Sequence, residues 1–191
     1  DGADRGLLRF VIAPEGEVTE HRYNGFGERT SSITYLGGRY AVVGLATDAV
    51  PTEAQLIAWI ATQNPAAAQR EDSTYDARGQ LQSRTTYTRL DASGAGIADG
   101  TEATETFVHG AFGCLLQTIS PSGGATSSAY DGRGRVLAVT DALGRITATQ
   151  YDDANRRTTL TQAGGLATTQ VHDAAGRLVA SLASAARTTL G

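Results

Sequence analysis

Acidic and basic side chains recur together at a fixed spacing, and such groups could take part in catalysis. Asp131, Asp152 and Asp173 lie 21 residues apart, and each is followed four residues later by an arginine. Neighbouring carboxylates can act as a general acid and a general base. Asp-x-x-Gly, however, is typical of a β-turn, because Asp accepts backbone hydrogen bonds and Gly supplies a positive φ. The regular spacing spreads these acids along an edge, so the sequence predicts no catalytic residue.

One loop has the spacing of a calcium site. A twelve-residue calcium loop places oxygen ligands at positions 1, 3, 5, 9 and 12 and Gly at position 6. Position 5 is Ala95, which offers no side-chain ligand, and no helix is predicted on either side. The alternative is a Gly-rich polar hairpin loop with solvated acids, and we assign no metal ligand and no cofactor. The residues that match positions 1, 3, 6, 9 and 12 are Asp91, Ser93, Gly96, Asp99 and Glu102.

Other reactive side chains lack the context of an active site. His109 and His172 take the Tyr position of the repeat, so we interpret them as replacements for a Tyr ring packed on the sheet; the third histidine is His21. Cys114, the single cysteine, follows the Gly of a degenerate turn and is interpreted as a small strand residue. The sequence has no Gly-x-Ser-x-Gly, and without Lys it has no phosphate-binding loop of the Walker type.

The elements that carry these residues repeat with a period of 21. His109, Tyr130, Tyr151 and His172 open four copies, and turns are expected to begin at positions 131, 141, 152, 162 and 173. Four-residue turns leave strands of six or seven residues, which predicts a strand–turn meander. Tyr23 and Tyr75 open two earlier copies. Further strands are predicted at 7–12, 30–35, 39–45 and 104–108.

Two segments interrupt the repeat. Residues 47–70 lack turn signals and favour a helix at 51–61, capped by Thr47 or Asp48 and stopped by Asn64-Pro65. Leu56, Ile57, Trp59 and Ile60 fall on one side of this helix at helical spacing, and we expect Trp59 to dock it onto the sheet. Residues 91–102 form the second insertion. The predicted organisation is one repeat segment over 1–191, with these two insertions inside it.

Composition narrows the functional class. The 191 residues are 40% hydrophobic, with 23 Gly and a net charge of −4, and no basic stripe suggests a nucleic-acid partner. No apolar run is long enough to span a membrane, and no signal peptide is visible. The lack of Met predicts a segment of a larger protein. Strands such as 166–171 have no strongly apolar face, so we expect a sheet with one or both faces wet.

The repeat resembles the RHS (YD-repeat) family. The resemblance is strongest over 103–182 and rests on Tyr-Asp-x-x-Gly-Arg at 130–135, a second Asp-x-x-Gly-Arg at 141–145, and Tyr151-Asp152. It extends more loosely to 75–79 and 23–27, and it departs from the pattern at His109-Gly110, Asn155 and His172.

This resemblance implies a mainly β fold: an antiparallel β-meander of YD repeats that forms a curved strip or part of a hollow shell, with one short helical insertion. It implies a structural, non-enzymatic wall of a secreted bacterial shell that encloses a toxic or effector polypeptide. The alternative is a cell-surface module that binds glycan or protein through its outer face. The implied partners are the remaining repeats of the parent chain and the enclosed polypeptide. The self-cleavage motif Asp-Pro-x-Gly of toxin-bearing members does not occur here.

Overall fold

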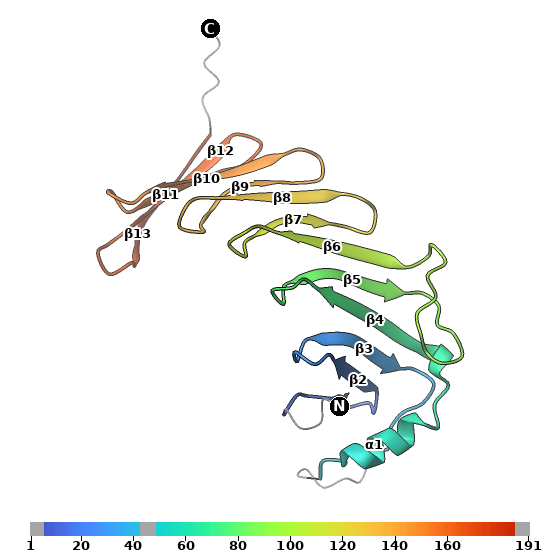
Figure 1. The fold of residues 1–191 in the computed structure, drawn as a ribbon. Coiled ribbons are helices and arrows are strands. Elements are labelled where there is room, and N and C mark those ends of the chain that lie inside the picture. The colour runs from blue at the N-terminus through green and yellow to red at the C-terminus, as the bar shows by residue number, and fades with distance from the viewer. Residues whose placement is uncertain (1–5, 43–48, 186–191) are drawn as a thin grey trace. The chain divides into compact units, whose positions relative to one another are not determined.

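The computed structural model describes residues 6–42 and 49–185, and the chain divides into two compact units at Thr106/Phe107. In the first unit, antiparallel strands are hydrogen-bonded to one another in sequence order (Figure 1). Its elements are β1 (Phe10–Ile12), β2 (Val18–Tyr23), β3 (Arg29–Tyr35), α1 (Glu53–Ile60), the 3₁₀-helix η2 (Pro65–Ala67), β4 (Ala68–Tyr75), β5 (Leu81–Tyr87) and the first part of β6 (Ala103–His109).

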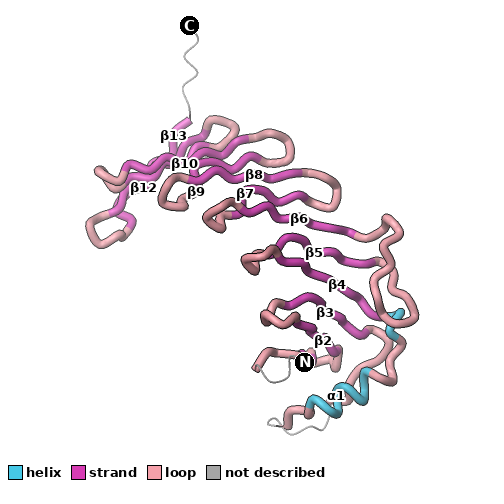
Figure 2. Tube along the Cα trace, viewed as in Figure 1, coloured by secondary structure: helices cyan, strands magenta, loops and turns pink. Residues whose placement is uncertain are grey.

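The second unit is also an antiparallel meander, and its strands are joined by loops alone (Figure 2). After the end of β6 it contains β7 (Leu115–Ile119), β8 (Ala125–Tyr130), β9 (Val136–Thr140), β10 (Ile146–Asp152), β11 (Arg157–Thr161), β12 (Leu166–His172) and β13 (Leu178–Ala185). The predicted mainly β meander with one short α-helix is therefore confirmed in the described residues.

The hairpin turns form because Asp and Gly occupy their required positions. In the turn after β8, the Asp131 carbonyl accepts a hydrogen bond from Gly134 N–H at 3.0 Å, and Asp131 N–H donates to the Arg135 carbonyl at 2.9 Å. Gly134 has φ = +78°, a conformation that a side chain disfavours. The ladder shifts register between Ala129 and Tyr130, as a glycine bulge produces. This geometry confirms the predicted turn.

The turn after β10 differs because Asn155 replaces Gly. The positive φ moves to Arg156, at +52°, which is the only described non-glycine residue with a positive φ. Asp152 pairs directly with Arg157, without the bulge. The strands nevertheless keep the register of the repeat, since Gln150 pairs with Thr159 as Ala129 pairs with Ala138. The change at 155 therefore goes with a different turn that lacks the bulge, while the rest of the ladder keeps its register.

Helix α1 begins at its own sequence signal. Thr52 is the N-cap, and its side chain accepts from the Gln55 backbone N–H while the Gln55 side chain accepts from Thr52 N–H. The predicted caps at 47 and 48 lie outside the described residues, and Pro51 precedes the helix instead of opening it. The helix ends at Ile60, before the predicted stop at Asn64-Pro65, and Asn64 instead caps the following 3₁₀ turn.

Trp59 docks α1 as predicted. Its ring meets Tyr35 of β3 edge-on at a centroid distance of 6.3 Å and Tyr40 at 6.0 Å. Leu56 is buried between helix and sheet, whereas Ile57 is 44% exposed, so the predicted apolar side of the helix is narrower than its spacing suggested.

Buried residues occur only in the first unit, within the described ranges. Val18, Ile33, Tyr35, Leu56 and Leu90 form its small core. Residues 107–185 include none that is fully buried, because their unit has a single layer of strands. The expected sheet with wet faces is confirmed there.

Two predicted strands need correction. The strand expected at 7–12 is limited to β1, because only Phe10, Val11 and Ile12 pair with β2. The strand expected at 39–45 does not form over 39–42, where Tyr40 N–H instead donates to the Gly16 carbonyl, and 43–45 lie outside the described residues.

Candidate functional site

Three of the described turns hold an ion pair between their first and fifth residues. Arg135 Nε donates to Asp131 at 2.8 Å, and the same Asp–Arg contact recurs at 141–145 and 173–177 at 2.7 and 2.8 Å. The other carboxylate oxygen of Asp131 accepts the backbone N–H groups of Arg133 and Arg135. The Arg135 backbone hydrogen bond lowers the pKa of Asp131, so this carboxylate is a fixed anion and a poor proton donor.

Where a repeat opens with tyrosine, its side chain fastens that repeat to the previous one. Tyr130 Oη donates to the Leu115 carbonyl at 2.8 Å, and Tyr151 Oη donates to the Val136 carbonyl at 3.1 Å. In both cases the acceptor is the first residue of the strand that follows the opening turn of the preceding repeat. The same bond joins Tyr23 to Leu8, and Tyr75 to Arg29. The tyrosine is thus a connector between repeats rather than a ligand platform.

Arg135 joins the turns at 131–135 and 152–156, which belong to consecutive repeats, through one guanidinium group. Besides Asp131 it contacts Asp153 of the later turn at 2.7 Å, and its Cζ lies 4.0 Å from the centroid of the Tyr151 ring. Arg133 reaches the same Asp153 carboxylate at 2.6 Å. The hydrogen bonds to Asp153 and Asp131 raise the pKa of Arg135, as a guanidinium between two carboxylates requires.

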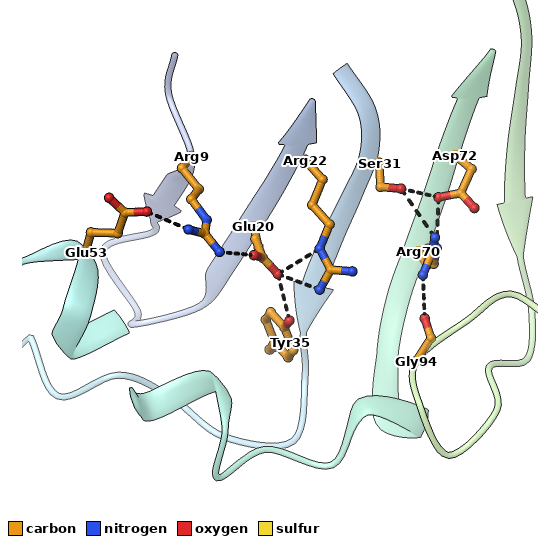
Figure 3. A network of polar contacts seen from close by, with 9 residues as sticks. All are labelled: Arg9, Glu20, Arg22, Ser31, Tyr35, Glu53, Arg70, Asp72 and Gly94. Atoms are coloured by element: carbon orange, nitrogen blue, oxygen red, sulfur yellow. Dashed lines mark hydrogen bonds and ion pairs between the residues drawn. The ribbon is translucent and has the colours of Figure 1, made fainter. Parts of the chain in front are cut away.

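A buried carboxylate organises the first unit (Figure 3). Glu20 Oε1 accepts Arg9 Nη2 at 3.0 Å, and Oε2 accepts Arg22 Nη2 at 3.0 Å and Tyr35 Oη at 3.1 Å. The Glu20 side chain is 4% exposed, whereas those of Arg9 and Arg22 are 40% and 52% exposed. Arg9 also donates to Glu53 at 2.5 Å, which connects the network to α1.

A second polar cluster lies on the same face of the sheet (Figure 3). Asp72 accepts from Ser31 Oγ at 2.6 Å and from Arg70 Nε at 2.8 Å, and Arg70 Nη1 donates to the Gly94 carbonyl at 2.8 Å. Register places both clusters on one face, because Ser31 pairs with Arg22 on one side and with Asp72 on the other. The loop at 91–102 is therefore anchored to the face that α1 covers.

The two insertions also approach each other. A Cβ added at Gly94 would lie 3.0 Å from Pro65, so the loop and η2 are in close contact. Between them and β3 there is a cavity of about 190 Å³, lined by residues that include Arg22, Tyr35 and Ile60. The segments that depart from the repeat thus form one cover over the buried network.

The buried carboxylate is not suited to proton transfer near neutral pH. Burial raises the pKa of Glu20, but hydrogen bonds from Arg22 and Arg9 outweigh it, so the pKa lies below its ordinary value. Burial and the neighbouring Glu20 raise the pKa of Tyr35 to about 12. A permanently ionised Glu and a permanently neutral Tyr are positioned to hold structure rather than to exchange protons.

The acids of the calcium-like loop are engaged by their own loop. One Asp91 oxygen accepts from the backbone N–H groups of Ser93 and Ala95, as in the repeat turns. Asp99 binds Arg89 and Thr101, and Glu102 accepts Gly100 N–H at 2.8 Å. In the described residues no group of three or more His, Cys, Asp or Glu side chains is placed to hold a metal ion. The hairpin-loop interpretation accounts for each of these contacts.

The histidines lie on separate strands. His21 Nδ1 lies 3.0 Å from Ser32 Oγ, and burial and the nearby Arg29 lower the pKa of His21. His109 ends β6 and His172 ends β12, both at the position that Tyr130 and Tyr151 take elsewhere. Cys114 is a free, half-buried cysteine just before β7.

Sequence reasoning missed the Glu20 network. Its only local signal is Glu20 and Arg22 two residues apart in a strand, which places both on one face. Arg9 comes from the segment before β1, Tyr35 ends β3 and Glu53 belongs to the helix, so the network depends on register and on the docking of α1. Among the described helices, none is long and apolar enough to cross a membrane.

Comparison with known proteins identifies the repeat. The family model of the RHS repeat matches residues 111–146, 130–167 and 151–189. A search of curated proteins finds no match. A structure of TcdB2-TccC3 without its hypervariable C-terminal region is similar at 14% identity over 87% of this chain and 9% of that chain, with a TM-score of 0.43.

Two further solved structures are similar to the chain. A Photorhabdus luminescens Tc holotoxin pore with a mutated TccC3 gives 14% identity, 87% and 9% coverage and a TM-score of 0.41. A TcdB2-TccC3-TEV structure gives 15% identity, 92% and 11% coverage and a TM-score of 0.33. The chain thus spans about a tenth of the length of these proteins.

The family match coincides with the turns of the second unit, and turns of the same geometry recur before it at 24–28 and 76–80. The resemblance predicted from Tyr-Asp-x-x-Gly-Arg is confirmed. Residues 111–189 match the model of the RHS repeat, so this part of the chain is built from RHS repeats.

Proposed function

We propose that this segment is part of the wall of a secreted RHS-repeat shell that encloses a polypeptide. The RHS repeats have a structural role: their acids, arginines and tyrosines are used within turns and between neighbouring strands. One observation above all supports the proposal that these repeats form a wall around an enclosed polypeptide. The second unit is a single layer of strands without a buried residue among 107–185.

Such a layer is unusual for a protein that acts alone. A sheet normally buries one face against another layer, since that burial supplies most of its stability. Here both faces stay partly accessible, and ladder hydrogen bonds, turn ion pairs and Tyr–carbonyl bonds hold neighbouring strands together. A wall needs that kind of cohesion, which is summed over repeats and does not require a core.

The distribution of charge also supports the proposal. Within β7–β13 only two residues carry a full charge, Asp152 and Arg157, and both are at strand ends. The other charges among residues 107–185 lie in the turns. The broad faces therefore present mainly Ala, Ser, Thr, Leu and Gln, which can border an enclosed chain without a fixed charge pattern that would select one sequence.

The proposal is tested by comparing the two faces of β10 in the full-length protein that contains this segment. Successive strand residues point to opposite faces, so Ala148 and Thr149 sample the two sides at one location. With Cys114 replaced by Ser, Ala148→Cys and Thr149→Cys variants would be treated with a bulky maleimide. A closed shell predicts that only one of the two thiols is labelled until the protein is unfolded.

Equal labelling of both thiols in the folded protein would overturn the enclosure. That result would leave a sheet open on both sides, as expected of the alternative adhesion module. Each variant is labelled again in denaturant, where both thiols must react, so that a poorly reactive cysteine is not mistaken for a protected one.

A further inference from the structure

We propose that Asn24 is a site of spontaneous deamidation, and that the turn built around it assists the reaction. Asn24-Gly25 is the only Asn–Gly pair in the sequence; the other two asparagines precede Pro65 and Arg156. Asn24 opens the first Tyr-side turn, at the position that Asp occupies in the turns at 76, 131 and 173. The proposed modification would give this turn the residue that the other turns already have.

The reaction requires a backbone nitrogen that can reach the side-chain amide carbon. The nitrogen of Gly25 forms a bond to Cγ of Asn24 and gives up its proton, the bond from Cγ to Nδ2 breaks, and the amide nitrogen leaves with that proton as ammonia. Water then opens the resulting succinimide to Asp or iso-Asp, so the net change consumes one water and releases one ammonia. Gly25 is exposed and has no side chain to obstruct ring closure.

The turn already polarises the amide that is attacked. Asn24 Oδ1 accepts the backbone N–H of Phe26 at 3.0 Å and that of Glu28 at 3.1 Å. Negative charge develops on this oxygen when Gly25 N adds to Cγ, and two aligned N–H donors stabilise such a charge. The same pair of donors on Asp131 meets an ionised carboxylate, which Gly132 N attacks far less readily than a neutral amide, so the Asn turn is the more reactive one.

The product would be a strained turn, because the partner of Asn24 is acidic. Asn24 Nδ2 donates to Glu28 Oε2 at 2.6 Å, whereas the fifth residue of the turns at 131, 141 and 173 is Arg. Conversion of Asn24 to Asp replaces that hydrogen bond by a contact between two carboxylates, which repel each other. Glu28 Oε1 also lies beside the turn at 76–80, since a Cβ added at Gly79 would be 2.8 Å from it.

Peptide mapping by mass spectrometry tests the site. The folded chain would be incubated in mildly alkaline buffer, and the fraction of Asp plus iso-Asp would be followed at each asparagine. We expect Asn24 to react about tenfold or more faster than Asn155, and faster in the folded chain than in denaturant. Asn64 is an internal negative control, because the Pro65 nitrogen carries no proton to lose and cannot form the succinimide. Gly25→Ala should slow the reaction, and this variant is tolerated since Gly25 has no positive φ and its added Cβ meets nothing within 4 Å.

Two results would overturn the proposal. One is an Asn24 that stays intact in the folded chain while it deamidates in denaturant, because the turn would then protect the amide. The other is equal rates at Asn24 and Asn155. The consequence is tested separately: Asn24→Asp should lower the melting temperature, and Glu28→Gln added to it should restore most of the loss.

Discussion

Arg135 lies over the ring of Tyr151, with its Cζ 4.0 Å from the ring centroid, while its nitrogens bind Asp131 and Asp153. Arg135 belongs to one repeat, and Tyr151 and Asp153 belong to the next. Tyr151 in turn donates its hydroxyl to the carbonyl of Val136, the residue that follows Arg135. The two side chains therefore secure each other at the junction of two repeats.

Arg135→Lys should weaken this junction more than Arg133→Lys. Lysine cannot reproduce the planar fork that binds two carboxylates while stacking on a ring. Arg133 makes one ion pair and its side chain is 70% exposed, so its replacement is the matched control. Thermal melting should show a clear decrease for Arg135→Lys and little change for Arg133→Lys. Equal decreases in melting temperature would mean that stacking on the Tyr151 ring adds no stability beyond that of the ion pairs.

Tyr151→Phe should destabilise the chain by about 0.5–1.5 kcal/mol, the usual net value of one hydrogen bond. The ring still stacks under Arg135, so only the bond from Oη to the Val136 carbonyl is lost. Tyr151→His places at this position the residue found at 109 and 172, and it should cost at least as much. Urea unfolding monitored by circular dichroism measures both. A Phe variant as stable as the parent would show that the hydroxyl is replaced by water without loss.

Glu20→Gln should cost about 1–3 kcal/mol, because a buried charge-assisted acceptor is lost while Arg9 and Arg22 remain. The partners are about half exposed, so solvent compensates them in part. Glu53→Gln is the control, and the exposed Arg9–Glu53 pair should contribute about 0–1 kcal/mol. Trp59 fluorescence reports on α1 directly, since its ring packs on Tyr35. If Glu20→Gln does not shift the unfolding transition monitored by Trp59 fluorescence, Glu20 has no role in holding α1 on the sheet.

The meander could be predicted from sequence because its determinants are local. Asp131, Gly134 and Arg135 specify a turn through bonds that span four residues, and a 21-residue period repeats it. The cover over Glu20 could not, because Glu53 reaches Arg9 from 44 residues away and Arg70 reaches the Gly94 carbonyl across 24. The exact cap was also missed: Thr52 and Gln55 form a capping box that spacing could have revealed, but Pro51 suggested an earlier start.

Acid should unfold the chain through its turn aspartates. The pKa values of Asp131, Asp141 and Asp173 are lowered, chiefly by backbone hydrogen bonds from the fifth residue of each turn. A lowered folded pKa contributes stability above the unfolded value of about 3.9, and this contribution is lost as pH falls through the folded value. Stability should therefore be level from about pH 7 to 5 and fall below about pH 4. Replacing Asp141 and Asp173 by Asn keeps an acceptor in each turn without the charge, so this variant should show a smaller decrease.

Arg156→Gly should stabilise the second unit. Arg156 has φ = +52°, a region that costs a non-glycine residue about 1 kcal/mol or more, and Gly enters it freely. The substitution also removes the Nε bond to the His172 carbonyl, which is long at 3.3 Å and exposed. We expect a net gain of about 0.5–1 kcal/mol in urea unfolding. Ala154→Gly, in the same turn without a positive φ, is the control and should be neutral or destabilising. A loss of stability in Arg156→Gly would show that the His172 contact outweighs the backbone strain.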